Sequence, residues 1–343
     1  MNIFINLTSN PNKIEFNESN PYILVVSDIH FGAHNSKSRD PNAETEKEHV
    51  MDFIKLLKKI NKNKDKLKGL VILGDFLDLV MTTYKKILRD DDFKNICKYF
   101  NRFNSYDIPI ILALGNHEIS VSIDDDISFS ERIGNFKSNF KQLHYITFCQ
   151  GLYIRKTKDN SILPKFEPFN EFNDENLQAI QENDFILMHG FQFNRDFYRN
   201  KVSKDFWKPL QEEQDTILKE MINLLYNYYL FEEKSMKDIK NHLNKYFEEI
   251  ERKGDRWFEN KSKLIRYSRI FKVLKKLKLT PENNIGFNRR IKKYLARFIT
   301  ERCHLIYGHT HNIEENLEKG NYLISNCGAW LNKNPSYIKI YLT

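Results

Sequence analysis

Residues 70–78 read LVILGDFLD and place two carboxylates directly after a short run of branched apolar side chains. A run of this kind is typical of a strand that is buried on both faces of a sheet. Gly74 permits a tight turn at the end of the strand, and Asp75 and Asp78 follow it. Because ligands in α/β folds bind at the loops after the strand ends, this stretch predicts a buried strand that leads into a polar site.

Further apolar runs predict strands elsewhere in the chain. They cover residues 22–26, 109–114, 185–188, 303–307 and 322–325. Between the first three predicted strands, apolar side chains recur at helical spacing over 44–62 and 93–103. Strands that alternate with helices predict an α/β fold in which helices pack against a sheet.

Composition excludes several classes of protein. Of the 343 residues, 41% are apolar, which is enough for a folded core and excludes a wholly disordered chain. The four cysteines form no C-x-x-C pair, so we expect no disulfide framework and a reducing, cytoplasmic environment. The N-terminus lacks the pattern of a secretion signal, and no run of 18 apolar residues predicts a transmembrane segment.

The sequence changes character after residue 194. Amphipathic helices are predicted over 210–231, 236–253, 258–278 and 288–302. Residues 195–304 carry 27 Lys and Arg against 16 Asp and Glu, whereas the formal charge of the whole chain is +8. We therefore predict a core of residues 1–194 and 303–343, and a basic helical insertion or lid over 195–302. Such an insertion is equally compatible with a solvated face and with a surface that attracts an anionic substrate or nucleic acid.

Side chains that bind metals follow each of five predicted strands. The segments are Ser27-Asp28-Ile29-His30, Gly74-Asp75-Phe76-Leu77-Asp78, Gly115-Asn116-His117-Glu118, His189-Gly190 and Gly308-His309-Thr310-His311. This mixture of oxygen and nitrogen ligands is too large for one ion and indicates two divalent metals that share a carboxylate, with Asp75 as the natural bridge. A pair of metals of this kind activates water near neutral pH and suits phosphate ester hydrolysis.

The ordered set D-x-H, G-D-x-x-D, G-N-H-E, H-G and G-H-T-H resembles the calcineurin-like metallophosphoesterase superfamily. The resemblance spans residues 23–311 and implies a four-layered α/β/β/α sandwich. It implies two ligand sets: Asp28, His30, Asp75 and His311 for one metal, and Asp75, Asn116, His189 and His309 for the other. It also implies that His117 contacts the phosphoryl group and protonates the leaving oxygen, and that Asp78 orients His117.

The expected activity is hydrolysis of a phosphodiester, a phosphomonoester or a nucleotide-like pyrophosphate by a metal-bridging hydroxide. Two divalent ions are expected; the resemblance puts Mn²⁺ first, while Fe, Zn²⁺ and Ni²⁺ suit the ligands equally well. Three cationic side chains just beyond His189 are candidates for contact with an anionic substrate: Arg195, Arg199 and Lys201.

Two alternatives from other functional classes stay open. A nuclease or nucleic-acid-processing enzyme would use the basic insertion for phosphate contacts, and its binding would fall steeply with salt. A metal-binding scaffold would keep the ligands without turnover. Leu79 stands where protein phosphatases of the superfamily carry Arg, and His117 stands where its diacylglucosamine diphosphatases carry Arg, so both of those assignments are disfavoured.

Overall fold

The computed structural model describes most of the predicted core. The described residues are 2–6, 19–32, 43–79, 84–115, 117–118, 129–155, 164–170, 180–182, 184–190, 291, 302–310, 313–319, 322–328, 330 and 336–342. They all belong to one compact unit of the chain. The predicted basic insertion over 195–302 lies outside the described residues, apart from Ile291 and Arg302.

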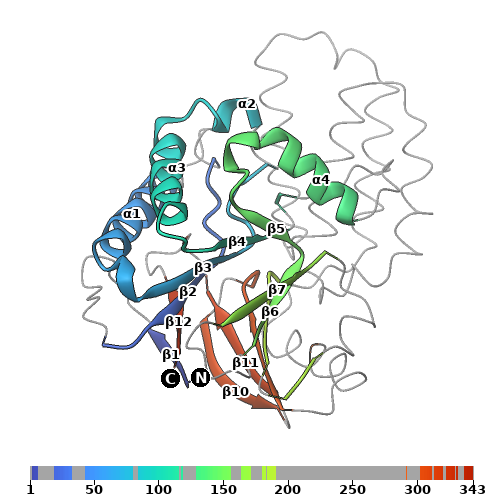
Figure 1. Cartoon of the computed structure of the whole chain (residues 1–343). Coiled ribbons are helices and arrows are strands. Elements are labelled where there is room, and N and C mark those ends of the chain that lie inside the picture. Colours follow the sequence, from blue (N-terminus) through green and yellow to red (C-terminus); the bar gives the residue numbers. More distant parts are fainter. Residues whose placement is uncertain are drawn as a thin grey trace, which may run out of the picture. The chain divides into compact units, whose positions relative to one another are not determined.

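The first sheet has six strands in the order β1-β12-β2-β3-β4-β5 (Figure 1). Their bounds are β1 Asn2–Asn6, β2 Tyr22–Val26, β3 Leu67–Leu73, β4 Ile110–Ala113, β5 Thr147–Cys149 and β12 Tyr337–Tyr341. Strands β2 to β5 are parallel, and β12 and β1 extend the sheet in antiparallel fashion. The carboxyl ends of the parallel strands β2, β3 and β4 therefore meet at one edge.

The second sheet also has six strands, in the order β10-β11-β9-β8-β6-β7. Their bounds are β6 Gly151–Arg155, β7 Lys165–Phe169, β8 Phe185–Met188, β9 Cys303–Tyr307, β10 Ile313–Lys319 and β11 Tyr322–Cys327. Strands β8, β9 and β11 run parallel, and β6, β7 and β10 are antiparallel to their neighbours. This sheet delivers the last two predicted motifs, which follow β8 and β9.

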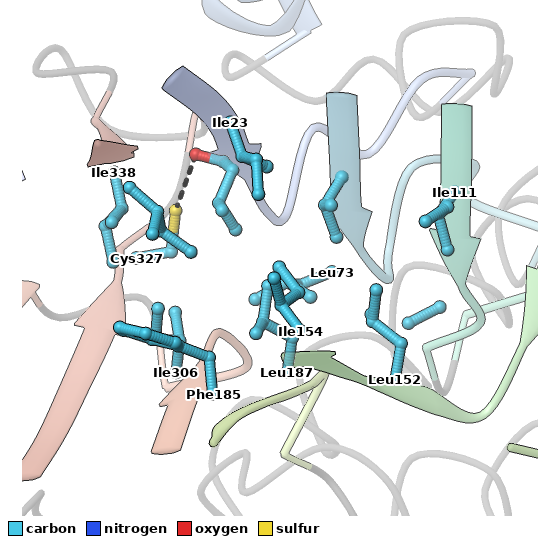
Figure 2. Close-up of a cluster of buried hydrophobic side chains, with 14 of the residues drawn as sticks. Ile23, Leu73, Ile111, Leu152, Ile154, Phe185, Leu187, Ile306, Cys327 and Ile338 are labelled. Atoms are coloured by element: carbon cyan, nitrogen blue, oxygen red, sulfur yellow. Dashed lines mark hydrogen bonds between the residues drawn. The ribbon is translucent and has the colours of Figure 1, made fainter. Parts of the chain in front are cut away.

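A layer of apolar side chains joins the two sheets. Figure 2 shows Ile23, Leu73 and Ile111 of the first sheet in one cluster with Leu187 and Ile306 of the second. Residues one position along the strands, such as Leu24 and Ile72, are also fully buried, so the strands are covered on both faces. That double burial explains why the sequence shows continuous apolar runs instead of alternation.

Helices pack against the first sheet (Figure 1). Their bounds, with two single turns of 3₁₀ helix, are α1 Ala43–Lys62, η3 Lys64–Lys66, α2 Tyr84–Ile87, α3 Asp91–Asn104, α4 Phe129–Asn139 and η4 Lys141–Leu143. The N-terminus of α3 is capped by Asp90, whose side chain accepts hydrogen bonds from the backbone N–H groups of Asp92 and Phe93. The predicted α/β class, with two sheets and helices, is confirmed.

No helix in the described part of the chain has the length and apolar character that a membrane span requires.

A buried histidine in β9 gives the fold a defined pH dependence. The His304 ring stacks on Phe185 and its Nε2 lies 2.8 Å from the Ser325 hydroxyl. Burial lowers the pKa of His304 to about 3. An unfolded chain takes up this proton near pH 6.5, so the free energy of unfolding decreases as the pH falls below that value.

We expect the variant His304→Leu to lose this contribution. Between pH 7 and pH 5, the free energy of unfolding of the parent protein should fall by about 2 kcal/mol more than that of the variant. Urea denaturation at the two pH values, with a chelator present, measures this difference. Equal decreases in the two proteins would contradict the assignment.

Candidate metal centre

The loops after β2 and β3 continue to pair beyond the ends of the strands. The backbone N–H of Asp28 donates to Gly74 O at 3.1 Å, and that of His30 donates to Asp75 O at 2.7 Å. An isolated bridge then joins Phe31 to Leu77. This extension of the sheet places the D-x-H segment alongside the G-D-x-x-D segment.

Four predicted ligands have an unusual backbone conformation. Asp28, His30, Asp75 and His309 have φ values of 54°, 51°, 48° and 69°, which lie in the left-handed region. Only one other described residue besides glycine, Asp107, has a positive φ. Residues other than glycine rarely adopt this backbone conformation. It costs about 1–3 kcal/mol for each residue, and residues that carry this cost cluster at functional sites. The left-handed turns direct these four side chains toward one centre.

The carboxylate of Asp75 lies in the middle of the cluster. Its Oδ1 accepts a hydrogen bond of 2.9 Å from the backbone N–H of His117. Its Oδ2 faces three imidazole nitrogens: it lies 3.2 Å from His189 Nε2, 3.7 Å from His30 Nε2 and 3.9 Å from His117 Nε2. One oxygen is therefore fixed by the backbone, and the other points into the site.

Two of these rings are held through their other nitrogen. His189 Nδ1 lies 2.7 Å from the carbonyl oxygen of Leu73, and His117 Nδ1 lies 2.9 Å from Asp78 Oδ1. In the tautomer that donates from Nδ1 to these acceptors, Nε2 carries the lone pair that a metal binds. The arrangement suits His189 as a metal ligand.

Asp28 is oriented in a comparable way. Its Oδ2 accepts hydrogen bonds from the Ser27 hydroxyl and from the backbone N–H of His309, the latter at 3.0 Å. Its Oδ1 lies 4.0 Å from His189 Nε2. A Cβ atom at Gly308 would collide with the Ser27 hydroxyl and with Asp28 Oδ2, so glycine is required at this close approach.

Glu118 ties two of the loops together. Its Oε2 accepts hydrogen bonds from the backbone N–H groups of Asp75 and Gly115, at 2.9 and 2.7 Å, and its Oε1 accepts one from Leu77 at 2.7 Å. Its contacts are those of a residue that supports the turns.

The buried carboxylates and imidazoles of the cluster shift one another's pKa values. Burial opposes ionisation of Asp75, but His189, His117 and His30 together hold its pKa well below the usual range. Burial lowers the pKa of His189, yet the charges of Asp75 and Asp28 outweigh it and raise that pKa to about 9. The field that favours a proton on His189 equally favours a divalent cation at the same place.

The side chains fit a pair of cations that share one carboxylate. Ligand atoms of Asp28, His30 and Asp75 lie within 4.8 Å of one another, and so do those of Asp75, His189 and His309. Each group combines carboxylate oxygen with imidazole nitrogen, a donor set that suits divalent transition metals. Asp75 belongs to both groups, as a bridging ligand requires.

The structure thus brings together five of the seven predicted metal ligands and the predicted pair His117 and Asp78. The two other predicted ligands, Asn116 and His311, lie outside the described residues, as do Arg195, Arg199 and Lys201. Sequence reasoning missed the Ser27 hydroxyl and the Leu73 carbonyl. Ser27 could have been noted from its place next to Asp28, whereas no sequence pattern marks a carbonyl oxygen.

Replacing Glu118 by Gln should destabilise the site. A carboxamide has one acceptor oxygen, so its NH₂ group would face the backbone N–H of Leu77 or of Asp75 and Gly115. Burial and the charge of Asp75 raise the pKa of Glu118 to about 7, so the comparison belongs at pH 8, where the carboxylate is ionised. We expect the free energy of unfolding to fall by about 1–3 kcal/mol.

Urea denaturation of the metal-free proteins measures this loss. The exposed Glu182 supplies the matched control, since Glu182→Gln should change the free energy of unfolding by less than about 0.5 kcal/mol. Equal stability of the two variants would show that the Glu118 hydrogen bonds do not matter.

Comparison with known proteins identifies the family of the chain. The model of the calcineurin-like phosphoesterase family matches residues 21–312, an interval that contains all five motifs. No curated protein matches the chain significantly. A solved structure of a dimetal phosphatase from Danio rerio is similar, with 9% sequence identity, a TM-score of 0.37 and coverage of 95% of this chain and 93% of that one. The chain belongs to the calcineurin-like phosphoesterase family and is a metal-dependent hydrolase of phosphoric esters.

Proposed function

We propose that the protein hydrolyses a phosphodiester or phosphomonoester, including nucleotide-like pyrophosphates, with two Mn²⁺ ions bound at the candidate metal centre. The observation that carries the proposal is the shared carboxylate of Asp75, which belongs to two separate groups of ligand atoms. Asp28 and His30 would hold one ion together with His311. His189 and His309 would hold the other ion together with Asn116. Ions bound in this way supply Lewis-acid polarisation of the phosphoryl group and activation of water.

His117 is the proposed proton donor to the leaving oxygen. Its Nδ1 is held at 2.9 Å by Asp78 Oδ1, and its Nε2 lies on the side of Asp75, 3.9 Å from Oδ2. Burial raises the pKa of Asp78, but the neighbouring His117 and His30 outweigh that effect and lower it, so Asp78 is ionised. An ionised partner at Nδ1 stabilises the imidazolium form, which can deliver the proton from Nε2.

The test is hydrolysis of bis-p-nitrophenyl phosphate and p-nitrophenyl phosphate by the Mn²⁺-loaded protein. We expect turnover of at least one substrate, and we expect His117→Ala to lower kcat by about 10²- to 10⁴-fold. Release of p-nitrophenolate measures the rate. Undiminished turnover in His117→Ala would remove this residue from the reaction.

Metal content separates the proposed roles of Asp75 and His117. Asp75→Asn should lose at least one of the two ions together with activity, because the bridging ligand serves both groups. His117→Ala should keep both ions while it loses turnover. Elemental analysis after equilibrium dialysis against Mn²⁺ measures the stoichiometry; loss of metal from His117→Ala but not from Asp75→Asn would reverse the assignment.

These two assays, together with nucleic-acid binding at several salt concentrations, decide between the alternatives. The nuclease alternative depends on the basic stretch 195–302 and on Arg195, Arg199 and Lys201, which lie outside the described residues. Cleavage of the diester with strongly salt-dependent binding of nucleic acid would favour it over the small-molecule enzyme. Two bound ions without turnover of any ester would instead favour a metal-binding scaffold.

A further inference from the structure

We propose that Asp78 positions His30 as well as His117, so that a single buried carboxylate fixes a metal-ligating ring and the proton-donating ring together. The inference rests on the proposed function, in which His30 binds a metal and His117 protonates the leaving group. It assigns to Asp78 a second role, as a positioning residue for the metal centre itself.

The two oxygens of Asp78 face different rings. Oδ1 lies 2.9 Å from His117 Nδ1, and Oδ2 lies 3.5 Å from His30 Nδ1. All three residues are buried, with exposed fractions of 5% for Asp78, 5% for His117 and 4% for His30. Each oxygen of Asp78 therefore faces the Nδ1 atom of one ring.

The backbone sets this arrangement. After the bridge between Phe31 and Leu77, the N–H of Asp78 donates to the carbonyl of Phe31 at 2.9 Å. That hydrogen bond holds Asp78 next to the residue that follows His30. The contact between Asp78 and His30 is thus built into the pairing of the two loops and does not depend on His117.

The other nitrogens of the two rings converge as well. His30 Nε2 and His117 Nε2 lie 3.7 and 3.9 Å from the same oxygen, Asp75 Oδ2. The ring centroids are 4.4 Å apart and the planes are nearly perpendicular, at 88°. Each imidazole therefore lies between Asp78, on the side of Nδ1, and Asp75, on the side of Nε2.

This geometry has a chemical consequence for His30. A histidine binds a metal through a nitrogen without a proton, and an acceptor at the opposite nitrogen selects the required tautomer. Ligand-orienting partners of this kind typically change metal affinity by about 10- to 100-fold. Removal of Asp78 should therefore weaken metal binding even in a protein that has no His117.

The experiment measures Mn²⁺ binding in a His117→Ala background, so that no effect can pass through His117. Free Mn²⁺ is quantified by its paramagnetic resonance signal as metal-free protein is titrated. We expect His117→Ala to bind two ions with the parental affinities. The double variant His117→Ala, Asp78→Ala should bind one of the two ions about 10- to 100-fold more weakly.

A matched variant separates the hydrogen bond from the charge. His117→Ala, Asp78→Asn also lacks the negative charge, but its carboxamide oxygen can still accept from His30 Nδ1. We expect it to recover most of the lost affinity. If the alanine double variant fails to fold, as judged by circular dichroism, His117→Ala, Asp78→Leu replaces it, because leucine has the same branch at Cγ and no acceptor.

Three results would overturn the inference. Unchanged affinity in the alanine double variant would mean that Asp78 acts only through His117. Equal weakening by alanine and asparagine would mean that only the charge matters. A third Mn²⁺ bound by the parent and lost from both double variants would make His30, Asp78 and His117 a metal site instead. Failure of the proposed function is recognised separately, because the parent would then bind fewer than two ions or hydrolyse no ester.

Discussion

The carboxylate of Asp75 is the constraint around which the other parts of the site are arranged. One of its oxygens is fixed by a backbone N–H, and the other meets three imidazole nitrogens within 3.9 Å. A buried anion in that position requires cationic neighbours. The imidazolium of His189 provides one in the metal-free protein, and bound metal ions would take its place. The strained turns and the close glycine contacts are the means by which the chain brings its ligands to this one atom.

Buried aromatic side chains pack the strained ligand loops against helix α3. Phe31 follows His30, and Phe76 follows Asp75, so in both loops a ligand is succeeded by a buried ring. Both rings pack against Phe93 of α3, with centroids 5.4 and 6.4 Å away. Burial of a phenylalanine contributes about 1.5–3 kcal/mol, which is enough to offset one left-handed residue. The helical layer therefore stabilises the ligand geometry as well as the sheet.

The sequence predicted those parts of the molecule that depend on local pattern. The runs at 22–26 and 303–307 match β2 and β9 residue for residue, because strands covered on both faces are apolar over most of their length. Strand β12, YIKIY, was not predicted, since Lys339 interrupts its apolar pattern although it is fully buried. In the site, too, local sequence pattern predicted some features and long-range contacts determine the others. Motif spacing identified the ligands, whereas the hydrogen bond from His189 to Leu73 joins residues 116 positions apart and depends on the docking of two sheets.

The hydrogen bond from His309 to Asp28 joins residues that are 281 positions apart and belong to different sheets. The second ligand group combines Asp75 of the first sheet's loops with His189 and His309 of the second sheet's loops, so it is complete only when both sheets have formed and docked. Contacts of such long sequence separation slow folding. A metal ion that binds only the completed site stabilises the native state in proportion to the logarithm of its concentration. Metal bound at this site would therefore contribute to the stability of the folded molecule as well as to catalysis.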